Sequence, residues 1–94
     1  MDINLLEEII GTIAEHLSLD IDDVTLDSDI TGDLGADSLD IVELCDIFET
    51  KYSLVATDEE IMALSTVESV YELIYNKLGM VQKSDNSNNE QLSW

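Results

Sequence analysis

The spacing of the apolar side chains most restricts what this chain can fold into. From residue 3 to residue 17 apolar residues recur every three or four positions, so they lie on one face of a helix. Glu7, Glu8 and Glu15 fall on the other faces. The pattern therefore predicts an amphipathic helix over residues 3–17. Its apolar positions are Ile3, Leu6, Ile9, Ile10, Ile13 and Leu17.

Two more helices follow a long polar connection. The second is predicted from about Ser38 to Lys51, and a short third helix should begin at Thr57, which forms a capping box with Glu60. Residues 18–36 are rich in aspartate, and long connections in small domains are more often packed or functional than idle. We expect this connection to wrap the domain and to turn its apolar side chains inward. These side chains are Ile21, Val24, Leu26, Ile30 and Leu34.

A fourth helix is predicted to start near Thr66 or Val67. Ser65 and Glu68 have the spacing of another capping box, and apolar residues follow at helical intervals. Gly79 is a suitable terminator, because glycine readily adopts the backbone conformation that ends a helix. The predicted helix therefore ends at Gly79.

Together these segments predict an all-α fold. It is a small bundle of three main helices plus one short helix, with a long loop between the first and second helices. The bundle would occupy residues 1–79 as one domain, since a chain of 94 residues has room for a single small core. Residues 80–94 are polar and offer too little apolar surface to order themselves, so they are predicted to form a disordered C-terminal tail.

Acidic residues far outnumber basic ones. The chain has 22 Asp and Glu against 3 Lys and Arg, and its formal net charge is −19. The electrostatic field of so negative a chain repels nucleic acid and attracts basic protein surfaces. We therefore expect basic protein partners and no nucleic-acid partner. No segment approaches the roughly 20 apolar residues of a membrane span. The single Cys45 excludes an internal disulfide and agrees with a reducing compartment, so a cytoplasmic location is expected.

The run Gly35-Ala36-Asp37-Ser38-Leu39-Asp40 places one hydroxyl at the start of the second helix. Asp37 is a good N-cap, and Asp40 lies three residues later, as in a capping box. Ser38 is then the first helical residue, with its hydroxyl facing water. A phosphate ester there would meet free backbone amides and the positive end of the helix dipole, which favours anions by about 0.3 to 1 kcal/mol. The position suits a group attached through a phosphodiester.

The run from Asp33 to Asp40, followed by Val42-Glu43-Leu44, closely resembles the acyl carrier proteins of fatty-acid and polyketide synthesis. The similarity extends from the first helix to about Leu78. It implies that Ser38 carries 4'-phosphopantetheine, flanked by Asp37 and Leu39, and holds acyl intermediates as thioesters. It also implies a monomer whose partners are a phosphopantetheinyl transferase and acyl synthase or acyltransferase enzymes with basic docking surfaces. Carriers of aminoacyl or peptidyl groups share the serine and the fold and remain an alternative.

The second helix carries an acidic row that is either a solvated face or a docking surface. The position of this acidic row beside Ser38 favours a docking surface. The resemblance to acyl carrier proteins implies a further, apolar contact from Val42. The predicted docking residues are Asp33, Asp40, Val42, Glu43, Asp46 and Glu49. The resemblance also implies an acyl pocket between the second and third helices, with candidates Leu44, Phe48, Val55, Ala56, Ile61, Met62 and Leu64. Asp46 and Ala56 depart from the family pattern, in which relatives often carry methionine and isoleucine.

Two rival classes find less support. Asp27, Asp29, Thr31 and Gly32 occupy the first, third, fifth and sixth positions of a calcium-loop pattern, with Thr31 a loose fit. The twelfth position is Ser38, which lacks the bidentate carboxylate that an EF-hand requires, so no metal ligands are predicted. An enzyme is not predicted either, because the chain has one histidine, one cysteine, no arginine and no glycine-rich phosphate loop. The lone histidine, at position 16, is assigned no catalytic role.

Overall fold

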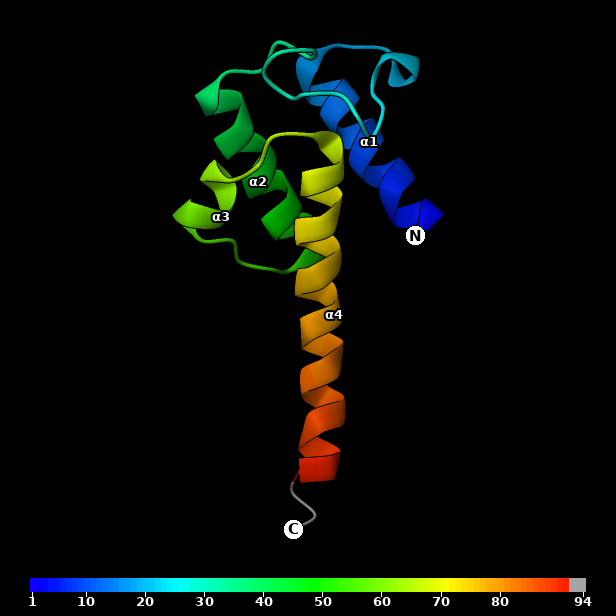
Figure 1. Cartoon of the computed structure of the whole chain (residues 1–94), viewed down its shortest axis with the longest axis vertical. Coiled ribbons are helices and arrows are strands. Elements are labelled where there is room, and N and C mark those ends of the chain that lie inside the picture. The colour runs from blue at the N-terminus through cyan, green and yellow to red at the C-terminus, as the bar shows by residue number, and fades with distance from the viewer. Residues whose placement is uncertain (92–94) are drawn as a thin grey trace.

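The computed structural model describes residues 1–91, with side chains described up to Gly79. It contains α1 (Ile3–Leu17), the 3₁₀ helix η1 (Ile21–Asp23), α2 (Ser38–Tyr52), α3 (Asp58–Met62) and α4 (Val67–Gln91) (Figure 1). The described residues form no strand, and one isolated bridge joins Asp29 to Thr66. The predicted all-α fold is confirmed, with three main helices, one short helix and a long loop after the first helix. No helix within residues 1–91 combines the length and apolar character needed to cross a membrane.

Local capping sets the ends of α1. The Asp2 side chain accepts a hydrogen bond of 3.1 Å from the Leu5 N–H and so caps the first turn. At the other end Ser18 has a left-handed backbone with φ of 59°, and the Leu19 N–H donates to the Ala14 carbonyl at 2.8 Å. This arrangement satisfies a carbonyl that the helix itself leaves free. The observed helix has the predicted bounds.

The start of α4 differs from the predicted capping box. Ser69, not Glu68, is the reciprocal partner: its N–H donates to Thr66 Oγ1 at 3.2 Å, and its own Oγ accepts from the Ser65 and Thr66 N–H groups at 3.0 Å each. The prediction of a Ser65 and Glu68 box is therefore wrong. A short serine side chain reaches these amides more directly than a glutamate that is exposed to solvent.

The predicted end of the fourth helix at Gly79 is also wrong. The backbone of α4 continues to Gln91, and among the described glycines only Gly35 has a positive φ. A glycine ends a helix when it adopts that left-handed conformation, and Gly79 does not. The side chains of residues 80–91 and all of residues 92–94 lie outside the described part. The boundary between a domain over residues 1–79 and a disordered tail over residues 80–94 stays a prediction.

The connection between α1 and α2 packs onto the bundle largely as expected. Val24, Ile30 and Leu34 are buried, and Leu26 is partly buried. Ile21 does not follow them: it is 61% exposed at the start of η1. Its inward packing was predicted from hydrophobicity alone, and the 3₁₀ turn directs the side chain to solvent instead.

Backbone hydrogen bonds pin this connection to the start of α4. The Ile30 N–H donates to the Ser65 carbonyl at 2.8 Å, and the Val67 N–H donates to the Ser28 carbonyl at 3.1 Å. The loop thus satisfies amides at the helix N-terminus that have no partner within the helix. The middle of a segment without regular structure is thereby held against the start of α4.

The core forms where the apolar faces of α1, α2 and α4 meet the connection. Two hydrogen bonds lie at its edges: the Asp2 backbone N–H donates to the Tyr71 hydroxyl at 2.7 Å, and the Tyr52 hydroxyl donates to Glu8 Oε1 at 2.7 Å. The largest fully buried side chains are Ile9, Ile13, Ile30, Ile74 and Val67. Most come from the residues that the helical periodicity placed on inner faces.

Shortening a buried isoleucine on α1 should destabilise the fold far more than shortening an exposed one. Ile13→Ala leaves a cavity at a side chain with 0% exposure and should lower the free energy of unfolding by about 2–5 kcal/mol. Ile21→Ala removes the same atoms from a residue that is 61% exposed and should change it by about 0.5 kcal/mol or less. Urea unfolding followed by circular dichroism measures both values. Equal losses in the two variants would show that the core assignment is wrong.

Candidate functional site

Ser38 is the first residue of α2, and the predicted capping box holds it there. Asp37 Oδ1 accepts from the Asp40 N–H at 2.9 Å, and Asp40 Oδ2 accepts from the Asp37 N–H at 3.1 Å. Gly35, with φ of 78°, makes the turn that leads into the cap. The capping box is therefore confirmed, and it places an exposed hydroxyl at a fixed point on a rigid element.

The surroundings of Ser38 suit an attachment point better than a catalytic nucleophile. The first turn of a helix leaves backbone N–H groups without partners, which favours a phosphate at this position. A nucleophilic serine needs a base to activate it. The chain's one histidine, His16, instead directs Nε2 toward carboxylates of Asp40 and Glu43.

An open groove of about 230 Å³ begins at Ser38. Side chains of α2 form one side, and α3 with the residues after it forms the other. All lining residues other than Ser38 are apolar. They are Ile41, Val42, Ile61, Met62 and Leu64.

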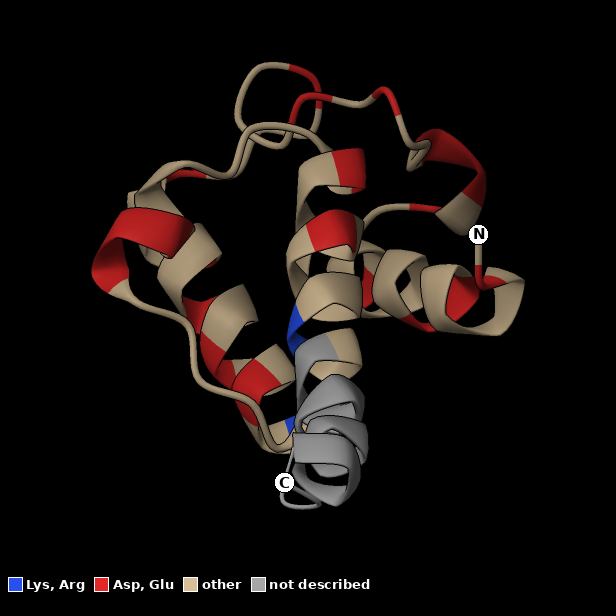
Figure 2. Cartoon of the chain, turned by 60° about the horizontal axis from the view of Figure 1, so that its bottom comes forward, with Lys and Arg blue, Asp and Glu red and all other residues tan. Residues whose placement is uncertain are grey.

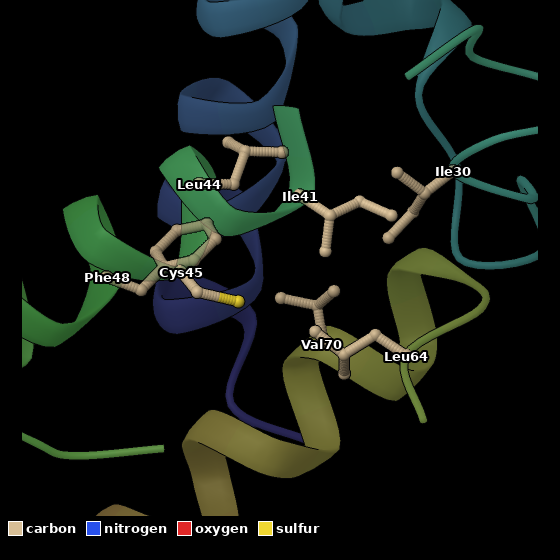
Figure 3. A pocket seen from close by; sticks show the side chains of 7 residues that line it. All are labelled: Ile30, Ile41, Leu44, Cys45, Phe48, Leu64 and Val70. Atoms are coloured by element: carbon tan, nitrogen blue, oxygen red, sulfur yellow. The ribbon is translucent and has the colours of Figure 1, made fainter. Parts of the chain in front are cut away.

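A second, enclosed space lies deeper between the helices (Figure 3). Its volume is about 10 Å³, close to the smallest space that holds one water molecule. Two residues, Ile41 and Leu64, line both this cavity and the groove. They therefore mark the junction between the attachment point and the core. The cavity is lined by Ile30, Ile41, Leu44, Cys45, Phe48, Leu64 and Val70.

Cys45 contributes its sulfur to this cavity wall (Figure 3). The residue is buried, and burial raises the pKa of its thiol to about 11, with further increases from the negative charges of Glu49 and Asp46. At neutral pH the group stays a protonated, apolar thiol. The cysteine therefore packs as a small hydrophobic residue.

The predicted pocket residues separate into three groups. Leu44, Phe48 and Leu64 line the enclosed cavity, whereas Ile61 and Met62 line the groove. The remaining two, from the connection before α3, line neither space; one of them is 76% exposed. These two are Val55 and Ala56.

Sequence reasoning missed four cavity residues. Ile41 and Cys45 lie on α2, where helical spacing from Leu44 and Phe48 was a usable signal: Ile41 is three residues before Leu44, and Cys45 is three before Phe48. The other two, Ile30 and Val70, come from the connection and from α4. Only the tertiary packing brings them to the same space.

Several carboxylates of the predicted docking face already hold backbone groups of the chain. Asp33 Oδ2 accepts from the Asp29 N–H at 2.8 Å, and Glu49 Oε2 accepts from the Ala56 N–H at 2.8 Å. Asp46 is exposed and lies next to Ile47, an exposed apolar residue. Acidic residues recur along the helices and the connecting segments, and basic residues are few (Figure 2).

The calcium-loop pattern has a different structural role. Asp29 Oδ1 accepts from the Thr31 N–H at 3.1 Å, the Thr31 hydroxyl at 3.0 Å and the Gly32 N–H at 3.0 Å. The Gly32 amide and the Thr31 hydroxyl hold the pKa of the Asp29 carboxyl below its usual value. This carboxylate closes the loop through the loop's own donors, so it does not need a cation to do so.

Comparison with known proteins decides the family. A family model described as a phosphopantetheine attachment site matches residues 7–74. The chain is 41% identical over 76 residues to the acyl carrier protein of Petrotoga mobilis, covering 81% of this chain and 89% of that protein. It belongs to the acyl carrier protein family. The carrier is 40% identical over 70 residues to the acyl carrier protein of Campylobacter jejuni, covering 74% of this chain and 91% of the relative.

Solved structures agree with this assignment of the fold. The acyl carrier protein of Thermotoga maritima matches the carrier with a TM-score of 0.73 at 26% identity, over 83% of this chain and 91% of that one. An apo doublet acyl carrier protein from prodigiosin biosynthesis shares the fold, with a TM-score of 0.69 at 22% identity over 79% of this chain and 36% of that one. The predicted family and fold are thereby confirmed.

Family membership also settles the class of activity. The protein is a phosphopantetheine carrier and not a catalyst, as the sequence predicted. Its prosthetic group is 4'-phosphopantetheine, and the partners of the family are phosphopantetheinyl transferases and biosynthetic enzymes. The residues present fit such a group, because Ser38 offers an exposed hydroxyl at a capped helix N-terminus.

Proposed function

We propose that the carrier holds acyl intermediates of fatty-acid or polyketide synthesis as thioesters on a 4'-phosphopantetheine arm attached to Ser38. The observation that supports this assignment most directly is the exposed Ser38 hydroxyl at the first residue of α2. The arm supplies the thiol that forms the thioester. The chain itself supplies an anchoring oxygen and a surface that partner enzymes recognise.

The neighbours of Ser38 have separate roles in this proposal. Asp37 and Asp40 cap the helix through each other's backbone amides, so the anchoring oxygen stays at the helix start. The unpartnered amides of the first turn face the phosphodiester and favour its negative charge. Leu39 is 64% exposed and offers the transferase an apolar contact beside the serine.

Removing the Ser38 hydroxyl should abolish attachment without unfolding the carrier. Ser38→Ala, incubated with coenzyme A and a broad-specificity phosphopantetheinyl transferase, should show no mass gain. Its stability should change by about 0.5 kcal/mol or less, because the side chain is exposed. Ser65→Ala removes another exposed serine and should be modified like the parent chain. Intact-mass analysis and peptide mapping give the readout, and a tether mapped to any other residue would refute the assignment.

We further propose a path for the acyl chain. It starts in the groove at Ser38, passes between Ile41 and Leu64, and enters the enclosed cavity. Both residues line both spaces, so the path needs no new opening elsewhere. The cavity of about 10 Å³ is too small for a chain, so side chains must move aside as it enters. An ion pair of 2.9 Å links Lys77 on α4 to Glu60 on α3, and it limits how far α3 can move away from α4.

Nuclear Overhauser contacts should report this path. In the carrier loaded with a medium-length saturated acyl chain, the chain's protons should contact the methyl groups of Ile30 and Val70, which line the cavity and not the groove. The methyl groups of Val55, which line neither space and are mostly exposed, should show none. Isotope-filtered spectra of the loaded protein make the measurement. Contacts confined to groove residues such as Met62 would exclude entry into the core.

Partner enzymes are proposed to dock through basic surfaces on the acidic face that surrounds Ser38. This docking face consists of Asp33, Asp40, Val42, Glu43, Asp46 and Glu49. Asp46 is exposed and Val42 adds an exposed apolar contact, so the face combines charge with a small hydrophobic area. Individual exposed ion pairs contribute little, which suits a carrier that must leave each enzyme.

Reversing one charge on this face should slow modification by a modest, salt-sensitive factor. Asp46→Lys should lower the transferase kcat/KM about two- to fivefold at low ionic strength, since an exposed pair contributes about 0.2–1 kcal/mol. The difference should shrink at about 0.5 M salt, where charges are screened over a few ångströms. Glu7→Lys makes the same charge change on α1 and serves as the control. Identical losses in both variants would mean that net charge, and not this face, governs docking.

A further inference from the structure

A mixed cluster of nitrogen and oxygen ligands joins the end of α1 to the start of α2. His16 Nε2 lies 3.1 Å from Glu43 Oε1 and 3.6 Å from Asp40 Oδ1. The three atoms all lie within 4.8 Å of one another, and among the described residues this is the one group arranged to hold a metal ion. We propose that these three side chains form a binding site for a first-row transition-metal dication such as Zn²⁺. This site is separate from the proposed attachment function.

The spacing of the ligand atoms fits a small dication. Zinc bonds of about 2.0–2.1 Å in a tetrahedral site place neighbouring ligand atoms roughly 3.3 Å apart. The two distances from His16 Nε2, 3.1 and 3.6 Å, fall on either side of that value. The third distance, between the Asp40 and Glu43 carboxylate oxygens, is no more than 4.8 Å, so side-chain movements that bring these oxygens closer would complete the site. Three protein ligands leave one position for water.

The type of ligand distinguishes this cluster from the rest of the acidic surface. Carboxylates alone suit Mg²⁺ and Ca²⁺, which take oxygen ligands. An imidazole nitrogen added to two carboxylates shifts the preference toward Zn²⁺, Co²⁺, Ni²⁺ and Cu²⁺. His16 is the chain's single histidine, so no other position on this surface offers the same ligand set.

Part of the site is organised before an ion arrives. Asp40 Oδ2 accepts from the Asp37 N–H in the capping box, which leaves Oδ1 directed toward His16. Such an outer hydrogen bond orients a ligating carboxylate. The side chains of His16, Asp40 and Glu43 are 21%, 33% and 48% exposed, so the ion can enter while losing part of its water shell.

A protonated His16 would also satisfy the two carboxylates, and this ion pair is the alternative that an experiment must separate from a metal site. A bound metal would be coordinated by Asp40 and Glu43, which belong to the docking face. The ion would then neutralise two negative charges beside Ser38. Metal binding and partner docking would oppose each other; this consequence, unlike the site itself, rests on the proposed function.

The test titrates Zn²⁺ and, separately, Mg²⁺ into the full unmodified chain by calorimetry. We expect one Zn²⁺ per chain. His16→Gln should weaken Zn²⁺ binding at least about tenfold, since even outer-shell substitutions cost about 10–100-fold in metal affinity. The same variant should leave Mg²⁺ binding unchanged. Glu15→Gln removes a neighbouring exposed charge on α1 and should alter Zn²⁺ affinity by less than about twofold.

A second readout follows the imidazole itself. Zn²⁺ should shift the ring resonances of His16 at one equivalent, and Mg²⁺ should not. Circular dichroism verifies that each variant is folded. Absence of a stoichiometric Zn²⁺ isotherm, or an isotherm that His16→Gln leaves intact, would overturn the proposal and leave an ion pair with adventitious surface binding.

Discussion

Burial of a few isoleucine and valine side chains must offset the mutual repulsion of a chain with a formal net charge of −19. Ile9, Ile13 and Ile74 bring α1 and α4 together, and Ile30 adds the long connection to the same core. Each helix can then turn its carboxylates outward. The acidic surface that partners would recognise exists because this small core keeps the helices together.

Many carboxylates do more than face water. Asp2 and Asp37 cap helices, Asp29 closes its loop, and Glu49 holds the backbone before α3. Each accepts hydrogen bonds from amides that would otherwise lack a partner. A count of acidic residues therefore overstates the number of carboxylates that are free to pair with a partner, and the face around Ser38 must be judged from individual side chains.

Local features of the sequence predicted the helices well. The α1 bounds, the start of α2 and the Thr57 cap of α3 follow from caps and periodicities that act within a few residues. Packing between distant segments was harder to predict. Ile30 and Val70 reach one cavity from opposite parts of the chain, and His16 meets two acids of another helix. No local sequence pattern predicts these contacts between distant residues, because they depend on how the helices cross.

The position of Cys45 has a chemical consequence for a protein that bears thioesters. A thiolate is the nucleophilic form of a thiol, and a pKa of about 11 leaves on the order of one thiol in 10⁴ ionised at pH 7. The chain has no other cysteine, and this one lies among apolar side chains of the core. An acyl chain that enters the cavity as proposed therefore lies beside a protonated thiol, which is not the nucleophilic form that attacks a thioester.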